Sequence, residues 1–396
     1  MKQPQGFVNQ EFPDHVLKVI MNLYGLKQAP RTWYKVAKTA ILSNGYLPNP
    51  ADPCLFYKWD NGTLGLIHLH VDDFAIACDT IEGLNSTSDF LKQSFEIGEE
   101  NDLHLHLGIS GTVERDGTIN INNDNYVDQL LCEFNMQDCD PVESPLSHSN
   151  FSSNDCPQQG TEEWAKMQRI PYRGLICKLA HLSRTTRPDI SYAVGVLSRF
   201  MSNPALIHWN AAKRILKYLK FRKTGSLSLN PKLLAPSSKF SVSLYVDADH
   251  AGDSDTSKST TGYFICVGQA LTAWNSKLQE KISTSSTHAE HIAAYHALTD
   301  LIWHQNILRS MDLLDETTPS VIYGDSIPSQ NLAMDWMVTA RSKHFDVKLR
   351  YINEQVDNGL VIFKHIPGQE NIADCLTKVV TKEKLTKFMN QVGLRF

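Results

Sequence analysis

Four acidic residues in the last third of the sequence could together hold metal ions. Asp247 ends an alternating apolar–polar run, and Asp325 directly follows the apolar run 320–324. Glu290 and Asp374 fall in segments with helical patterns. Carboxylate oxygens are the ligands that Mg²⁺ prefers, and two such ions about 3.5–4 Å apart can activate a water for phosphodiester cleavage. The chain contains 43 acidic residues, so spacing alone leaves open that Asp247 simply ends a strand.

The segments around these acids predict a mixed α/β sheet. Period-two alternation predicts three strands, and a long helix, a strand, a further helix, another strand and a last helix follow. Ala293, Ala294 and Ala297 share a helix face with Glu290, and such small side chains would let that helix approach the sheet closely. The predicted strands are 242–247, 262–268, 271–275, 320–324 and 360–364, and the predicted helices run from about Thr287 to Met311 and from Asn371 onward.

A second pair of acids, Asp72 and Asp73, lies between the apolar runs 64–69 and 74–78. This pattern predicts a tight hairpin with both carboxylates at its tip. Just upstream, Asn61 and Gly62 separate two strand-like runs and give a strong hairpin signal.

Residues 213–223 contain six cations and no acid, and their apolar residues recur at helical spacing. Lys213, Arg214, Lys217 and Lys220 would form the basic face of an amphipathic helix. Contact with nucleic acid and a merely solvated face are equal alternatives for this pattern.

The bulk composition is that of an ordinary folded protein. The 396 residues are 42% hydrophobic and 20% charged, with a net charge of −5 and eight cysteines that form no Cys-x-x-Cys motif. This cysteine usage argues against a zinc module or a disulfide framework and favours a reducing compartment. We find no membrane-spanning run and no apolar signal core at the start, and a polar linker is predicted at 230–238.

Longer motifs resemble the Ty1/copia-type retrotransposon polyprotein. The resemblance to its ribonuclease H domain is carried by YVDADHAGD (245–253), KSTTGY (258–263), SSTHAEHIA (285–293) and GQENIADCLTK (368–378). The resemblance to its reverse transcriptase is carried by LYGLKQAPRTWY (23–34) and VDD (71–73), and TRPDISYA (186–193) is similar to the connecting region. Together these motifs cover essentially the whole chain.

The resemblance implies both α+β and α/β parts. Residues 1–110 would be a partial reverse-transcriptase palm, 111–235 a mostly helical thumb or connection, and 240–396 a ribonuclease H-like five-stranded mixed sheet with helices. Asp247, Glu290, Asp325 and Asp374 would hold two Mg²⁺ ions, with Mn²⁺ as a substitute, to cleave the RNA strand of an RNA–DNA hybrid. His365 would assist product release, although a plain histidine at a strand end is an equal alternative.

For the polymerase part, the resemblance implies that Asp72 and Asp73 bind metal, and that Lys27, Gln28 and Arg31 face nucleic acid. Template RNA and a primer would be its partners, and no membrane is involved. Polyprotein-derived or homo-oligomeric partners are also expected, in the cytoplasm (within a virus-like particle) or in the nucleus. The family's first palm strand, with a further aspartate, lies upstream of the segment at which this sequence begins, so we expect an incomplete polymerase site.

Some positions depart from the family pattern, among them His70, His250, His288 and His291. None of these changes removes an expected nuclease ligand. The leading interpretation is therefore a ribonuclease H with a truncated reverse transcriptase. The alternatives are a decayed or co-opted fragment that binds nucleic acid without catalysis, and an incomplete product that rarely folds because its palm edges are exposed.

Overall fold

The structure, a computed structural model, describes residues 1–20, 23, 25–98, 100–101, 105–229, 239–334 and 346–396. It divides the chain into two units, Met1–Glu100 and Asn101–Phe396. The linker predicted at 230–238 lies outside the described residues. Within these described ranges, no helix combines the length and the apolar character needed to cross a membrane.

The first unit is a four-stranded antiparallel sheet, in the order β1-β2-β3-β4, with two helices. The predicted hairpin at Asn61 and Gly62 is present, with φ of 50° and 82°, the left-handed values that a two-residue turn of this kind requires. Ala37 and Ile41 pack with Phe56 in its core. The elements are α1 (Ala29–Ser43), β1 (Leu47–Pro48), β2 (Leu55–Asp60), β3 (Thr63–His70), β4 (Asp73–Cys78) and α2 (Ile81–Ser94).

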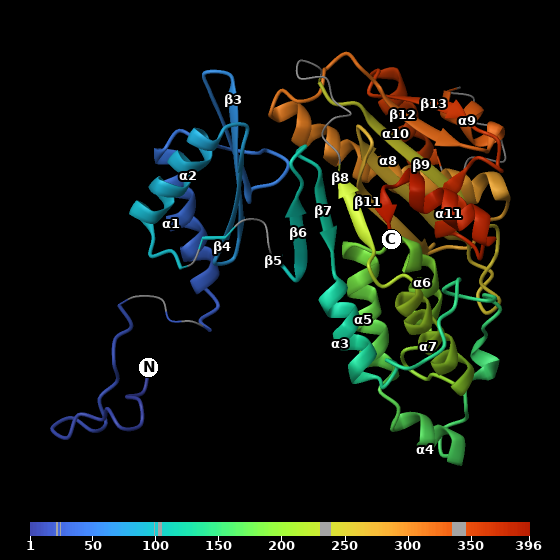
Figure 1. Ribbon diagram of the computed structural model, residues 1–396, viewed down its shortest axis with the longest axis horizontal. Coiled ribbons are helices and arrows are strands. Elements are labelled where there is room, and N and C mark those ends of the chain that lie inside the picture. The colour runs from blue at the N-terminus through green and yellow to red at the C-terminus, as the bar shows by residue number, and fades with distance from the viewer. Residues whose placement is uncertain (21–22, 24, 99, 102–104, 230–238, 335–345) are drawn as a thin grey trace. The chain divides into compact units, whose positions relative to one another are not determined.

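The second unit contains the predicted mixed sheet, in the order β11-β10-β9-β12-β13 (Figure 1). The strands β9, β10 and β11 are antiparallel neighbours, whereas β12 is parallel to both β9 and β13. Helix α8 packs on β9 and β10. The elements are β9 (Val242–Ala248), β10 (Thr260–Val267), β11 (Ala270–Leu278), α8 (Ser286–Ser310), β12 (Ser320–Gly324), α9 (Ile327–Met334), α10 (Asp346–Asp357) and β13 (Val361–His365).

The same unit contains an antiparallel sheet that the sequence analysis did not predict. Its order is β14-β8-β7-β6-β5, so it joins three strands near residues 105–122 to strands more than 100 residues further along the chain. The described residues 111–229 therefore contain strands as well as the predicted helices. The strands are β5 (Leu105–His106), β6 (Ile109–Val113), β7 (Ile119–Asn122), β8 (Ser226–Leu229) and β14 (Leu394–Arg395).

Helices occupy most of the segment between β7 and β8, as predicted. Their apolar faces share one core with part of the mixed sheet, where Leu179 and Leu216 join Phe264 and Phe388. The elements are α3 (Asp124–Glu133), η1 (Ser153–Asp155), α4 (Glu162–Gln168), α5 (Tyr172–Thr185), η2 (Pro188–Ile190), α6 (Ser191–Ser198) and α7 (Leu206–Phe221).

The end of the chain differs from the prediction of one helix that begins at Asn371. The structure has a short 3-10 helix, η5 (Ile372–Leu376), followed by a separate helix, α11 (Lys382–Gln391). The side chain of Asn371 accepts a hydrogen bond from the Ala373 amide and donates one to the Val246 carbonyl (2.9 Å). This second bond fixes η5 to strand β9, which places Asp374 beside the sheet.

A buried ion pair stabilises the junction between the helices and the antiparallel sheet. Two nitrogens of the Arg187 guanidinium donate to the Asp189 carboxylate, Nε to Oδ1 at 3.0 Å and Nη2 to Oδ2 at 2.7 Å. The Tyr218 hydroxyl also donates to Asp189, at 2.7 Å, and the Phe396 ring centroid lies 5.0 Å from the guanidinium. Asp189 lies in the first turn of η2, and its carboxylate serves as the counter-ion of Arg187.

We predict that Arg187→Met lowers the free energy of unfolding by about 3–5 kcal/mol, because it leaves the Asp189 carboxylate buried without its counter-ion. Denaturant unfolding followed by circular dichroism measures the change. The double variant Arg187→Met/Asp189→Asn should lose less than the single variant, since it removes the uncompensated charge. Equal stability of Arg187→Met and the unmutated chain would contradict this account.

Candidate metal centre and its neighbours

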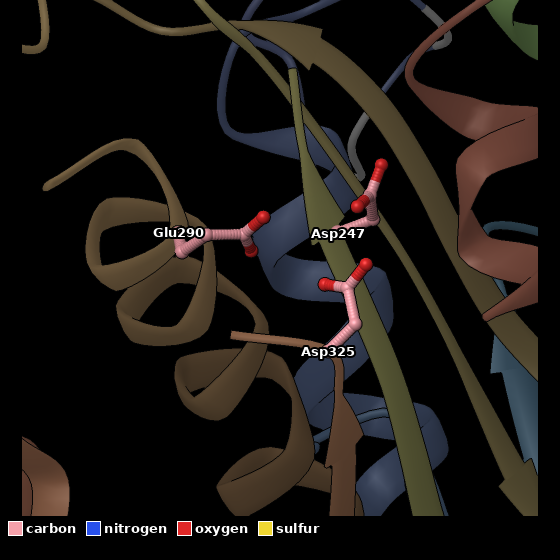
Figure 2. Close-up of side chains that lie close together, drawn as sticks. All are labelled: Asp247, Glu290 and Asp325. Atoms are coloured by element: carbon pink, nitrogen blue, oxygen red, sulfur yellow. The ribbon is translucent and has the colours of Figure 1, made fainter. Parts of the chain in front are cut away.

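Three of the four acids predicted for the nuclease site converge at one edge of the mixed sheet. Asp247, Glu290 and Asp325 each offer a carboxylate oxygen, and these oxygens all lie within 4.8 Å of one another. Figure 2 shows Glu290 reaching from its helix toward Asp247, while Asp325 points to the same space from the end of its strand. Within the described part of the chain, these three acids form the group of His, Cys, Asp or Glu side chains that lies close enough together to hold a metal ion.

The register of two parallel strands brings Asp247 and Asp325 to the same level. Tyr245 on β9 is paired with Tyr323 on β12, and each aspartate follows its tyrosine by two residues. The two tyrosine rings stack with their centroids 4.7 Å apart. Because parallel strands run in the same direction, this pairing delivers both carboxylates to the same edge of the sheet.

Helix α8 supplies Glu290 because its apolar face is built of small side chains. Ala293, Ala294 and Ala297 are buried, as the sequence analysis expected, and α8 packs on β9 and β10. The Ser285 hydroxyl accepts a hydrogen bond from the His288 amide and so caps the helix start. Glu290 lies in the first two turns of α8, so the close packing of this helix brings its carboxylate over the strand ends.

Burial and neighbouring charges raise the pKa of two of these carboxyl groups, Glu290 and Asp247. Burial raises the pKa of Glu290 to about 9, and the charges of Asp247 and Asp325 add to this shift. Burial also raises the pKa of Asp247, and the neighbouring charge of Asp374 acts in the same direction. Such carboxylates resist the loss of their protons until a cation neutralises them.

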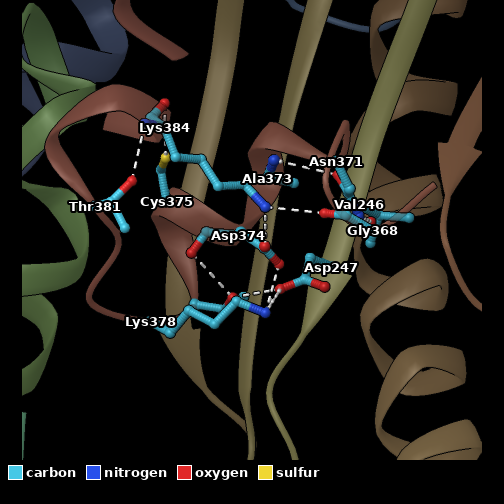
Figure 3. A network of polar contacts seen from close by, with 11 residues as sticks. Val246, Asp247, Gly368, Asn371, Ala373, Asp374, Cys375, Lys378, Thr381 and Lys384 are labelled. Carbon is cyan, nitrogen blue, oxygen red and sulfur yellow. Dashed lines mark hydrogen bonds and ion pairs between the residues drawn. The ribbon is translucent and has the colours of Figure 1, made fainter. Parts of the chain in front are cut away.

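Asp374 lies outside the group of three and is held by two lysines (Figure 3). Lys378 Nζ is 2.6 Å from Asp374 Oδ1, and Lys384 donates to Asp374 Oδ2. Lys378 Nζ also lies 3.9 Å from Asp247 Oδ2, an oxygen to which the Thr377 hydroxyl donates. Lys378 and Thr377, which follow Asp374 in the chain, therefore link Asp374 to Asp247.

The sequence analysis did not single out Lys378, Lys384 or Thr377. The spacing of Asp374 and Lys378, four residues apart, was a signal that could have indicated the first ion pair. Burial acts to lower the pKa of Lys378, but Asp247 and Asp374 together raise it above its ordinary value. Lys378 therefore remains a cation at this site.

Asp249 and His365 have distinct surroundings. Asp249, two residues after Asp247, accepts a hydrogen bond from the Thr260 amide and so joins β9 to β10. His365 is exposed at the end of β13 and is paired in register with Gly324, the residue before Asp325. Its place beside the carboxylate group fits the predicted role in product release, which stays a prediction.

In the first unit, Asp72 and Asp73 are exposed at the turn between β3 and β4. The Trp33 indole donates to the Val71 carbonyl at this tip, so the start of α1 lies beside it. Lys27, Gln28 and Arg31, which were predicted to face nucleic acid, are exposed at that same helix start. No described residue completes a group of three acids with Asp72 and Asp73.

The basic helix predicted at 213–223 is present as the second half of α7, but some of its cations bind within the protein. Arg214 Nη2 donates to the Ser144 hydroxyl at 2.9 Å, and Lys220 Nζ donates to the Cys139 carbonyl at 2.8 Å. Lys213 lies over the Trp209 ring, and Lys217 is half-buried. Arg214 and Lys220 therefore hold the segment 139–144 against the helix, and the role of all four cations in nucleic-acid binding stays a prediction.

The raised pKa of Glu290 predicts a specific pH dependence of stability. Above the ordinary value of 4.5 and up to about 9, the folded protein binds a proton at Glu290 that the unfolded chain has lost. With metals removed by a chelator, the free energy of unfolding should therefore fall as pH rises through this window, by at most about 1.4 kcal/mol per pH unit. Glu290→Gln should flatten the fall, and denaturant titrations at a series of pH values measure it. An unchanged slope in Glu290→Gln would contradict the prediction.

Comparison with known proteins gives the family context of this geometry. Residues 1–148 match the family described as "Reverse transcriptase (RNA-dependent DNA polymerase)". The whole chain is 35% identical to the "Retrovirus-related Pol polyprotein from transposon TNT 1-94" of Nicotiana tabacum, over 397 residues, and 32% identical to that of transposon RE2 of Arabidopsis thaliana, over 395 residues. It spans only 29% and 26% of the lengths of these two polyproteins.

Among solved structures, a match is the crystal structure of LC11-RNase H1 in complex with RNA/DNA hybrid. It is 20% identical, covers 34% of this chain and 93% of that one, and has a TM-score of 0.26. The likeness to Pol polyproteins comes from the sequence matches, which extend over the full chain. The chain is similar over its whole length to copia-type retrotransposon Pol polyproteins, and its first 148 residues match the reverse-transcriptase family.

Proposed function

We propose that residues 240–396 hydrolyse the RNA strand of RNA–DNA hybrids with divalent cations. The observation that carries this proposal is the convergence of Asp247, Glu290 and Asp325, whose carboxylate oxygens lie within 4.8 Å of one another. Three oxygen donors so close together, two of them with a raised pKa from burial, fit Mg²⁺ or Mn²⁺. The division of the chain into palm, connection and nuclease at 1–110, 111–235 and 240–396 is part of this proposal.

In this proposal each residue has a separate role. Asp247, Glu290 and Asp325 would hold the metal, which supplies activation of a water and stabilisation of the leaving oxygen. The Thr377 hydroxyl orients Asp247 by donating to its Oδ2 atom. His365, exposed and paired in register with Gly324 just before Asp325, would assist product release. Recognition of the RNA strand would rest on its 2′-hydroxyls and on the shape of the hybrid.

A second candidate function is binding of nucleic acid without catalysis. The observation that favours it is the pairing of both Asp374 oxygens with lysines, Oδ1 with Lys378 and Oδ2 with Lys384. If these ion pairs persist when the hybrid is bound, Asp374, the fourth expected ligand, cannot coordinate the metal. Cleavage of a labelled hybrid separates the two candidates.

We predict Mg²⁺-dependent cleavage of a labelled RNA–DNA hybrid by the whole chain, with no cleavage in the presence of a chelator. Asp325→Asn should lower the rate by more than about 100-fold, the upper figure for residues that merely orient a ligand. Asp315→Asn is a matched control, because Asp315 is half exposed and pairs with Lys239 instead. A folded chain that binds the hybrid but does not cut it would leave only the binding function.

We also propose that residues 1–396 alone do not extend a primer, because Asp72 and Asp73 have no third acid among the described residues. A two-metal polymerase site needs more ligands than this hairpin supplies. Primer extension on an RNA template should give no incorporation above that of the Asp72→Asn/Asp73→Asn variant. Incorporation that this double variant loses would refute the proposal.

A further inference from the structure

The strongest feature outside the three clustered acids is the network that ties Asp374 to Asp247 (Figure 3). Lys378 Nζ lies 2.6 Å from Asp374 Oδ1 and 3.9 Å from Asp247 Oδ2, so a single ammonium group faces both carboxylates. The two aspartates are almost fully buried, with exposed fractions of 2% for Asp247 and 6% for Asp374. A cation placed between two buried carboxylates offsets much of their repulsion.

We propose that Lys378 is a positioning residue that acts as a built-in counter-cation and competes with the second divalent cation for Asp247 and Asp374. This inference rests on the proposed metal-dependent function and deepens it. It assigns Asp247, Glu290 and Asp325 to a first ion, which Lys378 does not obstruct. The second ion can gain Asp374 only when the ammonium group of Lys378 moves away.

The two lysines on Asp374 differ in their freedom to move. The Lys384 side chain is mostly buried, at 19% exposed, and it also donates to the Gly368 carbonyl at 2.9 Å. The Lys378 side chain is 48% exposed, and both of its ion-pair partners belong to the carboxylate network. Lys384 therefore fastens the 368 loop to Asp374, whereas Lys378 can turn toward solvent or toward a phosphate group of a bound nucleic acid.

Contacts of the segment 371–378 restrict which atoms move when the Lys378 side chain turns away from the two aspartates. Asn371 binds the Val246 carbonyl, and the Thr377 hydroxyl reaches both Asp247 Oδ2 and the Asp374 carbonyl. The backbone amide of Lys378 also donates to the Asp374 carbonyl at 3.0 Å. Because the backbone is held at these points, the exchange of an ammonium group for a metal ion requires only rotation of the Lys378 side chain.

Binding of Mn²⁺ to the whole chain tests the proposal without any measurement of activity. Calorimetric titration, with free Mn²⁺ counted by electron paramagnetic resonance, should show one tighter and one weaker ion. In Lys378→Met the affinity for the weaker ion should rise at least about tenfold, because the competing positive charge is gone. Lys378→Arg, which keeps the charge, should resemble the unmutated chain. So should Lys382→Met, a matched control whose lysine pairs with Glu143 outside the site.

Thermal unfolding supplies a second readout that keeps the test decisive. Lys378→Met should melt at a lower temperature in chelator, since two buried carboxylates lose their counter-cation, and Mg²⁺ should raise its melting temperature more than that of the unmutated chain. Equal losses with and without Mg²⁺, with an unchanged Mn²⁺ isotherm, would overturn the proposal in favour of a purely structural lysine. Absence of any bound Mn²⁺ in both proteins would overturn it as well. Failure of hybrid cleavage while the isotherms still differ would overturn only the proposed nuclease function.

Discussion

The mutual repulsion of closely spaced carboxylates is the constraint on which the mixed sheet of the second unit depends. Asp247, Glu290 and Asp325 place their oxygens within 4.8 Å of one another, and Asp374 adds a fourth charge beside Asp247. Such an arrangement costs free energy in the absence of a cation, so rigid elements must hold it. The structure meets this requirement with two paired strands, a closely packed helix and two lysines rather than with flexible loops.

The central position of β9 explains how a sheet can hold these charges. On one side β9 pairs with β10 in antiparallel register, and on the other it pairs in parallel with β12. The parallel pair sets Asp247 level with Asp325, and the stack of Tyr245 between Phe264 and Tyr323 stiffens that register. A shift of one residue would turn Asp247 to the opposite face of the sheet, so the register and the site cannot be separated.

The sequence predicted the parts of this arrangement that depend on local pattern. Period-two alternation indicated the strands of the mixed sheet, and the small residues beside Glu290 indicated the close approach of its helix. What it missed depends on contacts between distant segments. The antiparallel sheet joins Leu227 to Leu394, and a strand of two residues such as β14 carries no periodicity of its own. The pairing of Lys384 with Asp374, ten residues apart across two different elements, likewise has no local signature.

The contrast between the two acidic motifs shows that the structural surroundings of a motif matter more than the residue types it contains. Asp72 and Asp73 form the more familiar pair, yet they are exposed at a hairpin tip without a third acid among the described residues. Asp247 ends an unremarkable strand, but burial and two neighbouring carboxylates give it the surroundings of a metal ligand. The basic helix is a second example. An amphipathic charge pattern is the same whether the basic face binds nucleic acid or contacts another segment of the protein. Arg214 and Lys220 bind segment 139–144, so the charge pattern there already has a structural cause.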